Sequence, residues 1–113
     1  MRFQRYFTVS SGAPTVKIIS PNGGETLQVG KTYDIKWTSS GVTSDKLILE
    51  LGSATFYRKQ IAEVSTSAGV YSWTVTSDFY ISPNEKNRVR VVCYNCPIFL
   101  QDNSDNYFSI VEP

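Results

Sequence analysis

The run Ser20-Pro21-Asn22-Gly23-Gly24-Glu25 leads within a few residues into Tyr33-Asp34-Ile35-Lys36-Trp37-Thr38. Asparagine and glycine accept the positive φ angles that tight turns need, so the first run predicts a turn. In the second run Tyr33, Ile35 and Trp37 alternate with polar residues, which is typical of a strand with one buried and one solvated face. A turn that feeds such a strand indicates a β-sandwich.

The same alternation recurs at short intervals along the chain. The predicted strands cover residues 15–20, 26–29, 31–38, 45–51, 56–62, 69–76, 88–93 and 107–111. No window shows the periodicity of an amphipathic helix. Residues 78–84 are expected to form a connection, and residues 94–106 the longest loop. We therefore predict an all-β fold, an immunoglobulin-like sandwich of seven to eight antiparallel strands.

The chain divides into an N-terminal extension, residues 1–14, and the sandwich, residues 15–113. Apolar and polar residues alternate in the first nine positions, and Ser10-Ser11-Gly12-Ala13-Pro14 is typical of a flexible joint. The extension can therefore form an additional strand, which can pair with the edge of its own sheet or with that of a neighbouring subunit. The side chains expected to make assembly contacts there are Phe3, Tyr6, Phe7 and Val9.

Composition excludes several classes of protein. With 113 residues, 41% of them hydrophobic, the chain can bury one core but not two. A net charge of +1 provides no general attraction for nucleic acid or for an anionic membrane, so neither is expected as a partner. No apolar run is long enough to span a bilayer, so no membrane insertion is expected. The N-terminus lacks the apolar stretch of a secretory signal, and none is visible in this chain.

Aromatic residues fall into a core set and a candidate binding set. Trp37 and Trp73 lie on the inward side of alternating strands, which predicts that both are core residues rather than sugar-stacking platforms. Tyr57, Phe79 and Tyr80 lie off the buried register and are the candidates for glycan contact. We expect Phe79 and Tyr80 to crowd the same end of the sandwich as residues 94–100, because binding loops usually cluster at one end.

Residues 94–100 form an unusually apolar loop. If this segment is buried, it is an additional strand of the core; if it is exposed, it is a contact patch. We favour the contact patch. Its predicted contact residues are Tyr94, Pro97, Ile98, Phe99 and Leu100.

Cys93 and Cys96 are the whole cysteine inventory. They can form a local disulfide or remain two free thiols beside a turn. A thioredoxin-like redox motif needs a βαβ context that this chain lacks. A zinc site needs about four ligands, and the chain has no histidine and no second cysteine pair.

The remaining polar residues give little indication of catalysis. Without histidine there is no histidine base to activate a nucleophile, so we do not expect an enzyme, a cofactor or a metal. Asp102 and Asp105 are a weak candidate for calcium, and the alternative that we favour is a turn held by side-chain hydrogen bonds. Arg88 and Arg90 are expected on a solvent face, where charges keep a sheet soluble.

Several motifs occur in the order found in a known family. They are Ser20-Pro21-Asn22-Gly23-Gly24-Glu25, Val29-Gly30, Tyr33, Ile35, Trp37-Thr38-Ser39-Ser40-Gly41, Gly69-x-Tyr71-x-Trp73-x-Val75, Arg88-Val89-Arg90-Val91 and Asp102-x-Ser104-Asp105-x-x-Phe108-x-Ile110. Over residues 16–111 the chain resembles the module of the Ser-Thr-rich glycosylphosphatidylinositol-anchored membrane family, which has relatives in fungal cell-wall glucan-assembly proteins and as repeated modules in secreted bacterial and archaeal proteins. Leu27 replaces a common aromatic residue, residues 56–62 match the pattern poorly, and the extension and the two cysteines have no counterpart in it.

The resemblance implies an immunoglobulin- or fibronectin-III-like sandwich in an extracellular or surface protein, without catalytic residues. We therefore predict a non-catalytic structural or interaction module of a surface, extracellular, virion or filament assembly. Its partners are expected to be proteins, including further copies of itself, bound through a sheet edge and loops. The alternative is a carbohydrate-associated module of a secreted or cell-wall protein.

Overall fold

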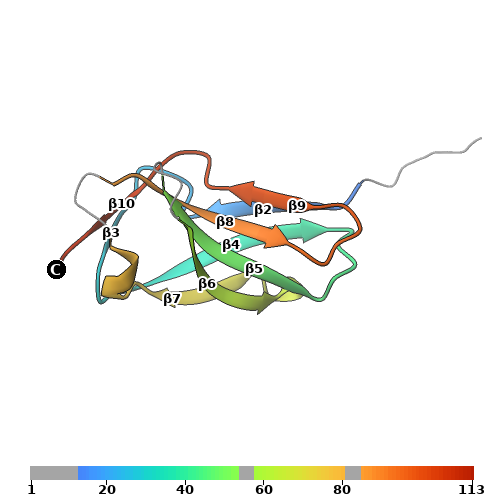
Figure 1. Ribbon diagram of the computed structural model, residues 1–113, viewed down its shortest axis with the longest axis horizontal. Helices are drawn as coiled ribbons and strands as arrows, with labels where there is room; N and C mark the ends of the chain where they lie inside the picture. The colour runs from blue at the N-terminus through green and yellow to red at the C-terminus, as the bar shows by residue number, and fades with distance from the viewer. Residues whose placement is uncertain (1–12, 54–57, 81–84) are drawn as a thin grey trace, which may run out of the picture.

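The computed structural model describes residues 13–53, 58–80 and 85–113, and these residues form a β-sandwich (Figure 1). The described residues contain nine strands and two short 3₁₀ turns, η1 (Thr66–Ala68) and η2 (Ser77–Phe79). The all-β prediction is confirmed. The predictions for Phe3, Tyr6, Phe7, Val9 and Tyr57 lie outside the described residues.

One sheet has the strand order β2-β4-β7 and is antiparallel throughout. Its strands are β2 (Thr15–Ser20), β4 (Thr32–Ser40) and β7 (Val70–Thr74). In β4 the side chains of Ile35 and Trp37 are buried and their neighbours are exposed, as the alternating sequence predicts.

The other sheet has the order β6-β5-β8-β9 and is also antiparallel. Its strands are β5 (Lys46–Ser53), β6 (Arg58–Ser65), β8 (Asn87–Cys93) and β9 (Leu100–Asn103). Strand β9 corrects the prediction that residues 94–106 form one loop. Its sequence Leu-Gln-Asp-Asn has little strand propensity, and its backbone pairing with β8 makes it a strand.

A third, short pairing joins β3 (Thr26–Gln28) to β10 (Ser109–Val111) at one end of the sandwich (Figure 1). These two strands run parallel, so the prediction that all strands pair antiparallel is wrong at this position. Strands from opposite ends of the chain can meet in this way because no hairpin connects them.

The two sheets enclose one hydrophobic core. Both tryptophans are buried in it, as predicted, and the ring of Trp73 meets that of Phe79 edge-on at 5.3 Å between centroids. The fully buried aliphatic side chains of this core are Ile18, Ile35, Leu47, Leu49, Leu51, Val75, Val89, Val91 and Ile110.

The opening turn is joined to the closing segment 102–108 by hydrogen bonds. The side-chain amide of Asn22 donates to Asp105 Oδ2 at 2.9 Å, and the backbone N–H of Asp105 donates to Asn22 Oδ1 at 2.7 Å. Ser104 is buried, and its hydroxyl donates to the carbonyl oxygen of Pro21 at 2.5 Å. The sequence motif therefore marks a junction between distant segments.

The carboxylates of the calcium candidate take part in similar contacts. Asp102 Oδ2 accepts the backbone N–H of Ile18 at 2.8 Å and so ties β9 to the facing strand β2. Asp105 accepts from Asn22 at the turn. Both carboxylates thus accept hydrogen bonds from residues more than eighty positions away in the sequence rather than from the nearby amides of a turn, and the calcium candidate stays a prediction.

Candidate functional site

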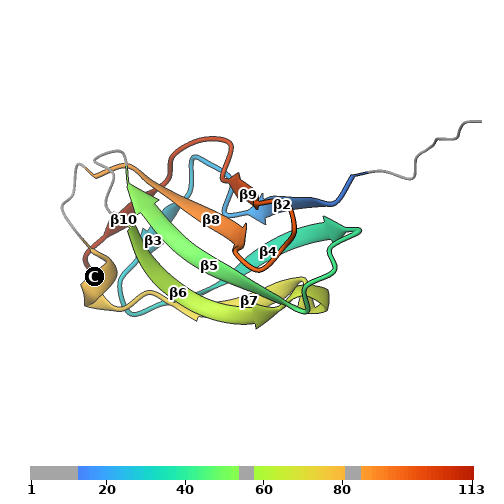
Figure 2. The same cartoon turned by 45° about the vertical axis from the view of Figure 1, so that its right-hand side comes forward.

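Three segments meet at one end of the sandwich, which we call the loop end (Figures 1 and 2). They are residues 39–45, from the end of β4 into the loop that follows, residues 65–67, from the end of β6 into η1, and residues 94–100, from the loop after β8 to the first residue of β9. The η2 turn lies at the opposite end, beside β3 and β10 (Figure 1). The prediction that Phe79 and Tyr80 share an end with residues 94–100 is therefore wrong. Strand β7 runs the length of the sandwich between η1 and η2 and separates them.

The loop between β8 and β9 is closed by a disulfide between Cys93 and Cys96. Cys93 is buried at the end of β8 and pairs in register with Leu100, the first residue of β9. Of the two alternatives left open by the sequence, the structure shows the disulfide. The covalent link restricts the backbone of residues 93–96, the first part of the loop.

The tip of this loop exposes large apolar side chains. Tyr94 is 54% exposed, Ile98 61% and Phe99 53%. Pro97 is also exposed, whereas Leu100 is half-buried where β9 begins. The predicted exposure is confirmed for the tip and is only partial for Leu100, and the contact role of these residues stays a prediction.

The loop folds back over the outer face of the β6-β5-β8-β9 sheet. The hydroxyl of Tyr94 donates to Glu50 Oε2 at 2.7 Å, and Arg90 Nε lies 3.5 Å from Glu50 Oε1. The guanidinium carbon of Arg90 lies 5.9 Å from the centroid of the Phe99 ring, within cation–π range. These contacts link the loop to side chains of β5 and β8.

Arg90 is only 8% exposed, so the prediction that it lies on a solvent face is wrong. The residue points to the outer face, as the alternation requires, but the folded-back loop shields it. Val92, on the same face, is also fully buried. A buried arginine needs a charged partner, which Glu50 provides.

The hydrogen bond from Tyr94 also affects its ionisation. The Glu50 carboxylate accepts a hydrogen bond from the neutral phenol, which raises the pKa of Tyr94 above its ordinary value, and partial desolvation acts in the same direction. Tyr94 therefore stays a neutral hydrogen-bond donor at physiological pH, and the loop keeps this anchor.

Two adjoining hollows open at the loop end. The larger, about 380 Å³, is lined mainly by hydroxyl side chains: Ser39, Ser40, Thr43, Ser44, Ser65, Thr66 and Ser67, with Gly41, Val42 and Asp45. We call it the hydroxyl hollow. The smaller, about 260 Å³, is mostly apolar and is lined by Pro14, Gly41, Thr43, Cys96, Pro97 and Ile98. We call it the apolar hollow. Gly41 and Thr43 line both.

Hydrogen bonds fix the walls of the hydroxyl hollow. The hydroxyl of Thr66 donates to the carbonyl oxygen of Ser44 at 2.9 Å, and the N–H of Thr66 donates to that of Asp45 at 3.0 Å. The indole N–H of Trp37 donates to the carbonyl oxygen of Thr66 at 3.2 Å, which ties the η1 turn to the core. The shape of this hollow is thus set by the fold.

Sequence reasoning did not identify the hydroxyl hollow. Its serines and threonines come from two separate runs, residues 39–44 and 65–67, that are visible in the sequence. Nothing local shows that they meet. The pairing of β5 with β6, which places Lys46 opposite Ser65, brings them together.

The structure places the two predicted glycan contacts that it describes, Phe79 and Tyr80, in different environments. Phe79 is 7% exposed and packs against Trp73, so its ring has no free face for a sugar, which corrects that prediction. Its burial follows from the η2 turn, which directs the ring into the core. Tyr80 is half-buried against the core, and its contact role stays a prediction.

A comparison with protein families matches residues 20–95 to the Kre9/KNH-like N-terminal Ig-like domain. The chain belongs to this family. The family comprises domains of secreted cell-wall proteins and is associated with yeast cell-wall glucan synthesis. The matched segment contains the opening turn, both tryptophans, Cys93 and Tyr94, and it ends before Pro97, Ile98 and Phe99. A search of curated proteins finds no match to the chain. Among the described residues no helix is long and apolar enough to cross a membrane.

Proposed function

We propose that this Kre9/KNH-like domain is a non-catalytic binding module of a secreted or surface-exposed protein, and that its loop end contacts a component of the cell wall. Membership of a family of cell-wall proteins supports the setting. The narrower relationship to glycosylphosphatidylinositol-anchored, Ser-Thr-rich proteins belongs to the same proposal and rests on the sequence motifs.

The observation that carries the proposal is the exposed apolar tip of the disulfide loop. Pro97, Ile98 and Phe99 follow directly after the disulfide, and the Tyr94–Glu50 hydrogen bond and the contact of Arg90 with the Phe99 ring anchor the loop to the outer face of the sheet. Tyr94, Ile98 and Phe99 are each more than half exposed. Exposed apolar clusters on a rigid support are typical of contact surfaces, because covering them releases ordered water.

The non-catalytic part of the proposal follows from the residues at this end. The chain contains no histidine, and Asp45 is the single carboxylate among the described residues that line the two hollows. Acid–base catalysis by carboxylates usually needs two of them in defined geometry. The lining groups are hydroxyls and apolar side chains, which suit binding.

Assembly of a filament or virion through residues 1–12 is not part of this proposal. Those residues lie outside the described ranges, and the matched family is one of cell-wall proteins. The carbohydrate alternative is favoured by a specific observation, the hydroxyl hollow next to the apolar tip.

The test is retention of the protein on isolated fungal cell walls, measured by co-sedimentation. The double variant Ile98→Ser, Phe99→Ser should lose at least about tenfold in retention, because truncating central apolar contacts removes much of an interface's binding energy. The control is Ile19→Ser, which replaces a 45% exposed side chain on β2, away from the loop tip. Equal retention of all three proteins, each with an unchanged circular dichroism spectrum, refutes the proposal.

A further inference from the structure

Three hydroxyl side chains of the hydroxyl hollow are available for a ligand. Ser39, Ser40 and Thr43 are exposed, and their hydroxyls make no hydrogen bond to any residue in the described part of the chain. Ser65 and Ser67 share one hydrogen bond at 3.3 Å and so keep further capacity. A ligand rich in hydroxyl groups can exchange hydrogen bonds with this lining without leaving a polar atom unpaired.

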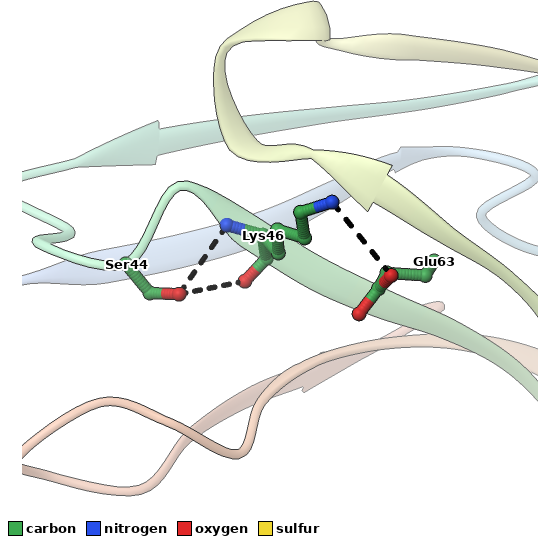
Figure 3. Close-up of polar contacts among 3 residues, drawn as sticks. All are labelled: Ser44, Lys46 and Glu63. Carbon is green, nitrogen blue, oxygen red and sulfur yellow. Dashed lines mark hydrogen bonds and ion pairs between the residues drawn. The ribbon is translucent and has the colours of Figure 1, made fainter.

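The charge around the hollows favours a neutral ligand. Of the described residues that line them, Asp45 is the single ionisable one, and its carboxylate would repel an anionic polymer. Lys46 follows directly, but its side chain runs along the outer face of β5 to Glu63 in β6, with Nζ 3.9 Å from Oε1 (Figure 3). Among the lining residues that the structure describes there is therefore no cation to balance sulfate, phosphate or uronate groups.

The two hollows together match the two kinds of surface on a sugar ring. A pyranose presents hydroxyls around its rim and C–H groups on its faces. The apolar hollow, with Pro97 and Ile98, can cover the C–H face, while the hydroxyl hollow meets the rim. The volume of the larger hollow falls within the roughly 300–1,000 Å³ range of small-molecule sites, and the two lining residues that it shares with the apolar hollow place the two side by side, as an extended chain would need.

The walls are already in the arrangement that binding needs. Thr66 links residues 44 and 45 to the η1 turn, and the hydroxyl of Ser44 donates to the carbonyl oxygen of Lys46 at 3.0 Å while accepting the N–H of Lys46 (Figure 3). Walls held by hydrogen bonds lose little further freedom when a ligand binds, which favours affinity.

We propose that the hydroxyl hollow and the apolar hollow form one binding site for a neutral polysaccharide chain. This inference rests on the proposed function, because it names the class of ligand that the loop end would take. The ligand runs across Gly41 and Thr43, which line both hollows.

The direct test is isothermal titration calorimetry of the full chain with two soluble neutral polysaccharides, laminarin and yeast mannan, and one anionic polysaccharide, polygalacturonate. Binding to at least one neutral polymer and none to polygalacturonate is expected. The double variant Ser40→Ala, Thr43→Val removes two available hydroxyls with little change of shape and should weaken that binding about tenfold, as expected for the loss of one to two net hydrogen bonds. The control Ser72→Ala, on the solvent side of β7, should bind as the parent does.

The outcomes separate this inference from the proposed function. Equal affinity of the parent and the double variant, stronger binding of polygalacturonate, or no binding of either neutral polymer overturns the polysaccharide site. If wall retention persists but is abolished by digesting wall proteins with a protease, the partner is a protein; the proposed function then stands and this inference fails. If retention on whole walls is also absent, both fail.

Discussion

Replacing Ser104 with alanine removes only one oxygen atom, yet it should destabilise the domain by about 3 kcal/mol. Ser104 is 1% exposed. Its Oγ accepts the N–H of Val89 at 3.0 Å and donates to the carbonyl oxygen of Pro21 at 2.5 Å. The Ser104 N–H also donates to the Val89 carbonyl oxygen at 2.8 Å. The side chain thus continues the pairing of β8 beyond the end of β9 and joins it to the opening turn.

The magnitude follows from the two groups that the substitution leaves without a partner. Pro21 and Val89 are both buried, so water cannot replace the lost hydroxyl. A buried donor or acceptor without a partner costs about 1–3 kcal/mol, which gives roughly 2–6 kcal/mol for two. In a domain of this size a loss of about 3 kcal/mol lowers the melting temperature by roughly 10–15 °C.

The assay is urea unfolding followed by tryptophan fluorescence, because both tryptophans are in the core. The midpoint should fall by about 1–2 M with an unchanged slope. Ser72→Ala is the matched control: Ser72 is exposed and its hydroxyl donates to Asp34 Oδ1 at 3.3 Å, so its loss should cost less than about 0.5 kcal/mol. If Ser104→Ala is as mild as this control, the junction between the opening and closing motifs does not stabilise the fold as argued.

Three further predictions concern the turn and the loop end. Gly23→Ala should lower the free energy of unfolding by at least about 2 kcal/mol in urea titrations, because φ is +138° and the new Cβ would lie 2.5 Å from Asn106 Cβ; stability within about 0.5 kcal/mol of the parent would contradict this. Glu50→Gln should lower the pKa of Tyr94 toward its ordinary value in ultraviolet titrations of tyrosinate. Because folding raises the pKa of Tyr94, the stability that this hydrogen bond contributes is fully present below the pKa of Tyr94 in the unfolded chain and is lost as the pH rises through its pKa in the folded protein. If Glu50→Gln leaves the pKa of Tyr94 unchanged, the hydrogen bond is absent in solution. Reducing the disulfide should cost about 2 kcal/mol by the chain-entropy relation and speed proteolysis within residues 94–99, whereas unchanged cleavage would show that the link does not hold the loop.

The strands whose side chains alternate could be predicted from the sequence. Ile35 and Trp37 in β4, and Leu47, Leu49 and Leu51 in β5, are all buried as predicted. Successive side chains of a strand point to opposite faces, so a strand with one buried face shows alternating apolar and polar residues in its sequence. The family motifs carried the same information, and the match over residues 20–95 agrees with it.

The errors arose where distant segments determine the environment. Arg90 occupies an outward position of β8 and is nevertheless buried, because the disulfide loop folds back over it and brings Tyr94 and Phe99 beside the Glu50–Arg90 pair. Strand β9 has no strand-like sequence and exists through its pairing with β8.

The candidate site divides in the same way. The exposed apolar tip was predicted from a short run of residues, since Pro97, Ile98 and Phe99 are adjacent in the chain. The hydroxyl hollow was not predicted. Its two walls, residues 39–45 and 65–67, are distant in the sequence and are brought together by the register in which β5 pairs with β6. Alternation along a strand is a local property that any one segment displays. Which residues contact a loop or an outward-facing charge depends on how distant segments pack together, and only the tertiary structure shows those contacts.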